Sequence, residues 1–99
     1  PSVGWLIVVE PDRNADTPLH MAVKRDHFRE VKLLCKMGAD PGLKNKNGDT
    51  SLHLAVKYKR TKIARYLYMT AKQVADVKNK RSETPRLMAK RMEMTNIFA

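Results

Sequence analysis

The sequence predicts an all-α fold, a solenoid of stacked helix–turn–helix units. A motif of eight residues occurs three times, at 16–23, at 49–56 and, in a more divergent form, at 83–90. Its threonines lie 33 and then 34 residues apart, and self-similarity at a fixed period of this size is typical of repeat proteins. Aromatic residues make up only 6% of the chain. Small aliphatic side chains must therefore do most of the packing, which suits thin layers of short helices.

The motif also resembles a known repeat family. Its first copy reads Asp-Thr-Pro-Leu-His-Met-Ala-Val and its second Asp-Thr-Ser-Leu-His-Leu-Ala-Val. This pattern and period resemble the ankyrin repeat, a β-turn followed by two helices. Residues 28–40, which end in Leu-Leu-Cys-Lys-Met-Gly-Ala-Asp, are similar to the second helix of that family. The resemblance covers about 14–98 and implies an ankyrin-repeat solenoid with projecting hairpin loops, here called fingers.

The resemblance implies a repeat domain over residues 14–99. The repeats are expected at about 14–46, 47–80 and 81–99. The third is truncated, so we expect the chain to be part of a larger protein. Residues 1–13 lie outside the pattern, and we expect the apolar run from Trp5 to Val8 to cap the exposed end of the first repeat. A distorted or cut earlier repeat is the alternative, and two and a half repeats would be marginally stable in either case.

The first helix of the first repeat should begin at Thr17-Pro18. A threonine hydroxyl can accept a hydrogen bond from a free backbone N–H at a helix start, and proline suits the first helical position. Apolar side chains then recur at helical spacing. They are Leu19, Ala22 and Val23.

A second helix is predicted over 28–36. It should end at Gly38, because glycine readily takes the positive φ of a helix C-terminus. Its buried stripe is expected to consist of Phe28, Val31, Leu34 and Cys35.

The finger of residues 45–49 contains Asn47-Gly48, a pair that favours a tight turn with positive φ at the glycine. The second repeat keeps the apolar pattern on both helices. Its core residues should be Leu52, Ala55, Val56, Ile63, Ala64 and Leu67. Because 71–73 replaces the Gly-Ala-Asp ending, we expect a longer or less regular helix end there. The third repeat has lost the Asn-Gly turn, and Leu87 replaces the histidine of the motif.

No residue pattern indicates catalysis or metal binding. His20, His53 and Cys35 are the candidates, but the chain has no Cys-x-x-Cys or His-x-x-x-His spacing and no phosphate-binding loop. The resemblance implies that the two histidines are structural and join the turn to the adjoining helix. Cys35 is predicted to lie in the core, where thiols are inert. We therefore expect no enzyme, no cofactor, no metal and no small-molecule substrate.

The resemblance implies a concave face, formed by the fingers and the exposed side of each first helix. Transfer of the matching positions gives three columns: Met21, Leu54 and Met88; Lys24, Lys57 and Arg91; Arg25, Tyr58 and Met92. The fingers add Lys44, Lys46, Lys78, Lys80 and Arg81. Methionine, tyrosine and arginine suit binding surfaces. The alternative for the first column is that it simply packs between neighbouring helices.

The basic charge is confined to one part of the chain. Residues 1–40 contain six basic and six acidic residues, whereas 41–99 contain fourteen basic and four acidic ones, which accounts for the whole net charge of +10. Such asymmetry favours an acidic partner, although a solvated basic surface is the simpler alternative.

The predicted function is a non-catalytic protein–protein interaction module whose partner has an acidic, partly apolar contact segment. One alternative is docking on a polyanion, either nucleic acid or an anionic lipid surface. Another is a regulatory ankyrin domain of a parent enzyme. The single cysteine cannot form an internal disulfide, and no basic segment precedes Trp5 to Val9 as it would in a signal peptide. We therefore expect an intracellular location, cytoplasmic or nuclear.

Overall fold

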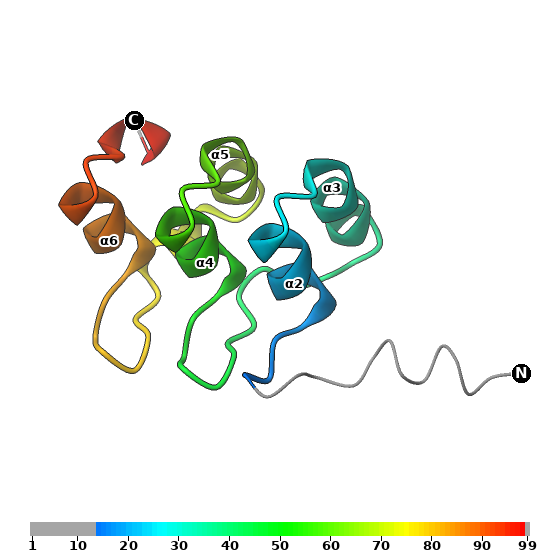
Figure 1. The fold of residues 1–99 in the computed structure, drawn as a ribbon, viewed down its shortest axis with the longest axis horizontal. Helices are drawn as coiled ribbons and strands as arrows, with labels where there is room; N and C mark the ends of the chain where they lie inside the picture. The colour runs from blue at the N-terminus through cyan, green and yellow to red at the C-terminus, as the bar shows by residue number, and fades with distance from the viewer. Residues whose placement is uncertain (1–13, 99) are drawn as a thin grey trace, which may run out of the picture.

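The computed structural model describes residues 14–98, which contain five α-helices and two 3₁₀ helices and no strand. In chain order the elements are α2 (Pro18–Lys24), α3 (Phe28–Lys36), α4 (Ser51–Lys57), α5 (Thr61–Thr70), η1 (Lys72–Asp76), α6 (Pro85–Arg91) and η2 (Thr95–Phe98). Figure 1 shows α2, α4 and α6 in one row and α3 and α5 in a second, with the fingers projecting beside the first row. The predicted solenoid of helix–turn–helix units is confirmed. The predicted cap at Trp5 to Val8 lies outside the described residues.

The core lies between the two rows of helices and between successive repeats. Helix α4 packs against α2 on one side and α6 on the other, and α3 packs against α5. The apolar faces predicted for α2, α4 and α5 are all buried. The largest fully buried apolar side chains are Leu52, Ile63, Leu67, Ile97, Val23, Val31 and Val56. No repeat could bury such a face alone, so each repeat is stabilised by packing against its neighbours.

Threonine begins each first helix, as predicted for Thr17. The hydroxyl oxygens of Thr17, Thr50 and Thr84 accept from the backbone N–H three residues later, at 3.2, 3.3 and 3.0 Å. Pro18 and Pro85 follow directly and stand at the start of α2 and α6. This local chemistry sets the beginning of α2, α4 and α6 before any packing is considered.

The ends of α3 and α5 follow the predictions, whereas the buried stripe of α3 does not. Gly38 takes a φ of +97° after α3, and the end of the second repeat is irregular as expected, since η1 follows α5. The buried stripe of α3 is narrower than predicted. Val31 is buried, whereas Phe28, Leu34 and Cys35 are only half-buried, because α3 lies at the edge of the described stack. Cys35 is thus not a full core residue, although burial still raises the pKa of its thiol.

Candidate functional site

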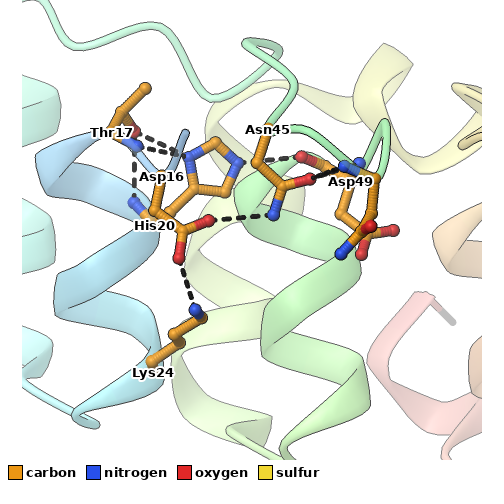
Figure 2. A network of polar contacts seen from close by, with 7 residues as sticks. Asp16, Thr17, His20, Lys24, Asn45 and Asp49 are labelled. Atoms are coloured by element: carbon orange, nitrogen blue, oxygen red, sulfur yellow. Dashed lines mark hydrogen bonds and ion pairs between the residues drawn. The ribbon is translucent and has the colours of Figure 1, made fainter. Parts of the chain in front are cut away.

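A network of polar side chains attaches the finger of 45–49 to the first repeat (Figure 2). The Asp16 carboxylate, only 1% exposed, accepts from the Asn45 amide at 2.9 Å and also pairs with Lys24. The Asn45 side-chain oxygen accepts in turn from the backbone N–H of Asn47 and of Asp49, both at 3.0 Å. Asn45 therefore closes its own finger and holds that finger against the preceding repeat.

The same arrangement recurs one repeat later. The Asn79 amide donates to the Asp49 carboxylate at 2.8 Å, and its oxygen accepts from the backbone N–H of Arg81 and of Glu83, both at 2.9 Å. A backbone bond from Lys80 N–H to the carbonyl of Asn47, 3.1 Å long, runs beside it. The fingers are thus bonded to one another side by side, so the backbone that carries their cations has a defined position.

His20 and His53 join each turn to its helix and also to the next repeat. Their Nδ1 atoms accept from the backbone N–H of Thr17 and Thr50, at 3.1 and 3.0 Å. Because Nδ1 accepts, the ring proton is on Nε2, which donates to the carbonyls of Asp49 and Glu83, each at 2.8 Å. The structural role predicted for both histidines is confirmed.

His53 should make the stability of the domain pH-dependent. Burial lowers the pKa of its imidazole, and this outweighs the raising effects of the Glu83 carbonyl bond and the nearby carboxylates. Protons therefore bind preferentially to the unfolded chain once the pH falls below the ordinary imidazole pKa of about 6.5. The contribution of His53 is complete above that pH and is lost as the pH falls below it. The melting temperature should drop over this range, and it should drop less in a His53→Gln variant. Equal drops in both proteins would contradict this role.

A pocket of about 200 Å³ lies where the two fingers meet α4 and α6. Its lining consists of Asn47, Asp49, Lys57, Asn79, Arg81, Glu83, Met88, Arg91 and Met92. The structure thereby brings together three cations that the sequence placed on the concave face, namely Lys57, Arg81 and Arg91. Amides, carboxylates and two methionines surround them.

The cations of the Lys24 column differ in their partners. Lys24 and Arg91 each pair with the acidic residue eight positions earlier, Asp16 and Glu83 respectively, and the Arg91 guanidinium lowers the pKa of the Glu83 carboxyl. Within residues 14–98, no carboxylate lies within ion-pair distance of Lys57. Its Nζ lies 5.8 Å from the ring centroid of Tyr58 instead. Lys57 is therefore the cation of this column that an acidic partner can neutralise without breaking an existing ion pair.

The structure places the other predicted site residues at different depths. Leu54 and Met88 are 2% and 5% exposed and belong to the core, which agrees with the alternative that their column packs between helices. Met21 is half-buried. Among these other residues, the exposed side chains on the helices are those of Arg25, Tyr58 and Arg91. The fingers add the exposed side chains of Lys44, Lys46, Lys78, Lys80 and Arg81. The accessible surface is consequently more basic and less apolar than the sequence indicated.

Sequence reasoning missed the two asparagines that hold the fingers. Asn45 and Asn79 lie 34 residues apart at equivalent places, and this was the signal that could have identified them. Across residues 14–98, no group of three or more metal-binding side chains lies together, and no helix has the length and apolar character needed to cross a bilayer.

Comparison with known families agrees with this geometry. A family model described as ankyrin repeats, in three copies, matches residues 1–81, most of the 99-residue chain. No curated protein matches the chain.

Proposed function

Because the chain belongs to the ankyrin-repeat family, we propose that it is a protein-interaction module that binds an acidic, partly apolar partner segment on its concave face. Ankyrin repeats are generally non-catalytic modules that bind other proteins. The observation that supports the finer proposal is Lys57, a cation without a carboxylate partner among the described residues, in a pocket that Arg81 also lines.

A carboxylate of the partner fits the chemistry of this pocket. It would meet Lys57 and Arg81 together, and a charge-assisted hydrogen bond is about twice as strong as a neutral one. The half-buried Met92 lines the same pocket, and Tyr58 is exposed beside Lys57. These two side chains offer apolar contact area next to the cations, and tyrosine is common among the residues that dominate binding energy. We therefore infer one acidic anchor with an apolar neighbour in the partner.

The fixed fingers support the same proposal. Arg81 is carried by a finger whose backbone is held by Asn79 and, through Lys80, by the preceding finger. A surface whose shape is set before binding loses less conformational entropy when a partner docks. The backbone that carries Arg81 thus meets a partner in a position that is already defined.

The test is a selection of 15-residue peptides from a displayed library on the whole chain. The selected peptides should be enriched in Asp and Glu with one or two apolar residues. A Lys57→Glu/Arg81→Glu variant should then bind the best peptide at least about a hundredfold more weakly, because like charges that face each other across an interface cost several kcal/mol.

A Lys32→Glu/Lys36→Glu variant is the matched control, since it changes the net charge by the same amount on α3. Its affinity for the peptide should stay within about threefold of the wild type, because only diffuse attraction is altered. Equal losses in both variants, or selected peptides without acidic residues, would argue against the concave face. Polyanion binding would be favoured instead if peptide affinity fell steeply with rising salt and unrelated polyanions bound with the same salt dependence.

A further inference from the structure

The outer side of α3 carries a basic stripe that the concave face does not include. Arg29, Lys32, Leu33 and Lys36 lie at helical spacing on one side of the helix and together line one shallow depression. Leu33 is 57% exposed among these three cations.

Helix α5 continues the stripe. Lys62 and Arg65 follow Arg29 and Lys32 after 33 residues, so they occupy equivalent positions in the next repeat. Met69, 63% exposed, occupies the position equivalent to Lys36. The two helices lie side by side in the second row of Figure 1.

An aromatic contact joins the two helices at this surface. The rings of Phe28 and Tyr66 pack edge to face with centroids 5.8 Å apart. The Nζ atoms of Lys32 and Lys62 lie 5.4 and 5.0 Å from the Phe28 ring centroid, one from each helix. The exposed sides of α3 and α5 therefore form one continuous surface, here called the outer face.

The charge of the outer face is not compensated. It carries five cations, namely Arg29, Lys32, Lys36, Lys62 and Arg65. Within the described part of the chain, none of them lies within ion-pair distance of a carboxylate. Glu30, the acidic residue of α3, contacts His27 at 3.4 Å instead. The outer face thus combines unpaired positive charge with exposed aliphatic side chains.

We propose that the outer face docks on an anionic membrane surface. Lysine and arginine are attracted to anionic headgroups, while apolar side chains between them can enter the boundary with the acyl chains. Leu33 and Met69 provide such side chains. Nucleic acid fits less well, because phosphate contacts use lysine and arginine and give no role to the exposed Leu33 and Met69. Single strands also stack on aromatic rings, and the Phe28 ring lies under Lys32 and Lys62.

The outer face is separate from the concave face. It belongs to the second row of helices, whereas the fingers project beside the first row (Figure 1). The two surfaces can therefore be occupied at the same time, and the domain would hold an acidic partner at an anionic membrane. This inference does not depend on the proposed function, because it uses different residues.

The experiment is cosedimentation of the whole chain with lipid vesicles. Vesicles of phosphatidylcholine with one third phosphatidylserine should bind it at least about tenfold more tightly than pure phosphatidylcholine. The Lys32→Glu/Lys36→Glu variant should lose at least about tenfold in affinity, and Leu33→Ser/Met69→Ser about threefold or more.

Two controls make the outcome specific. Lys57→Glu/Arg81→Glu changes the net charge equally on the concave face, and Leu87→Ser removes an exposed leucine of α6, so both should retain vesicle binding within about threefold. Circular dichroism and melting curves should show that all variants are folded. The proposal is overturned if both charge reversals weaken binding equally, or if Leu33→Ser/Met69→Ser binds like the wild type. Tighter binding of a DNA duplex than of the vesicles would likewise overturn it and favour a nucleic-acid surface.

Discussion

Replacing Gly48 with valine is expected to lower the free energy of unfolding by about 4 kcal/mol. Two causes add together. Gly48 has a φ of +77°, a conformation in which a β-branched residue is strained. A Cβ atom at this position would also lie 2.7 Å from the backbone nitrogen of Lys80 in the next finger. Because that contact is with backbone, the finger must move, and the bond from Lys80 N–H to Asn47 is lost with it.

Gly38 is the matched control for this prediction. Its φ is +97°, yet a Cβ atom there would meet nothing within 4 Å. Gly38→Val should therefore cost only the conformational strain, about 2 kcal/mol. Urea denaturation would measure both variants, and amide hydrogen exchange at Lys80 should accelerate only in Gly48→Val. Equal losses at the two glycines would show that the close approach between fingers contributes nothing.

The parts of the fold that the sequence predicted are those set by local chemistry. Thr17 begins α2 and Gly38 follows the end of α3 because each acts on backbone groups within a few residues of itself. The apolar periodicity of α2, α4 and α5 needed no knowledge of the neighbours either. Such features recur in each copy of the motif, so each copy supports the same prediction independently.

The parts that the sequence did not predict depend on neighbouring repeats. Leu54 and Met88 were placed on the concave face, but their burial is decided by how closely α4 packs against α2 and α6. The narrow stripe of α3 has the same cause, since half-buried Cys35 lacks a described repeat on one side. The position of a residue within a repeat therefore predicts the face on which its side chain lies better than it predicts how deeply that side chain is buried.

The chemistry of the candidate site was predicted only in outline. The column of Lys24, Lys57 and Arg91 was found by matching positions, but its partners differ between repeats. Asp49 stands where Asp16 and Glu83 stand, but it forms no ion pair with Lys57 among the described residues. The bond from the Asn79 amide does not account for this difference, because Asp16 accepts the same bond from Asn45 and still pairs with Lys24. Side-chain pairing of this kind depends on the folded geometry, which the position of a residue within the motif does not specify.

The last prediction is that His53→Leu should lower the free energy of unfolding by about 3 kcal/mol. Leucine fills the buried space but leaves the buried Thr50 N–H without its partner and removes one of the two donors to the Glu83 carbonyl, which keeps its bond from the Asn79 N–H. A buried donor without a partner costs about 1–3 kcal/mol, and the lost bond to the carbonyl adds about 1 kcal/mol. Amide exchange in the finger of 79–83 should also accelerate, because the bond from His53 Nε2 to the Glu83 carbonyl joins that finger to the second repeat.

The third repeat provides the comparison for His53→Leu, because Leu87 already stands at that position. It is 55% exposed, so Leu87→His can complete the polar start of α6 but has no later finger to bond within the described residues. That variant should gain at most about 1 kcal/mol, the usual value of a helix cap. A loss for His53→Leu no larger than this gain would mean that the histidine contributes little to holding the fingers. A loss near 3 kcal/mol would instead identify the histidine as a principal bond between repeats.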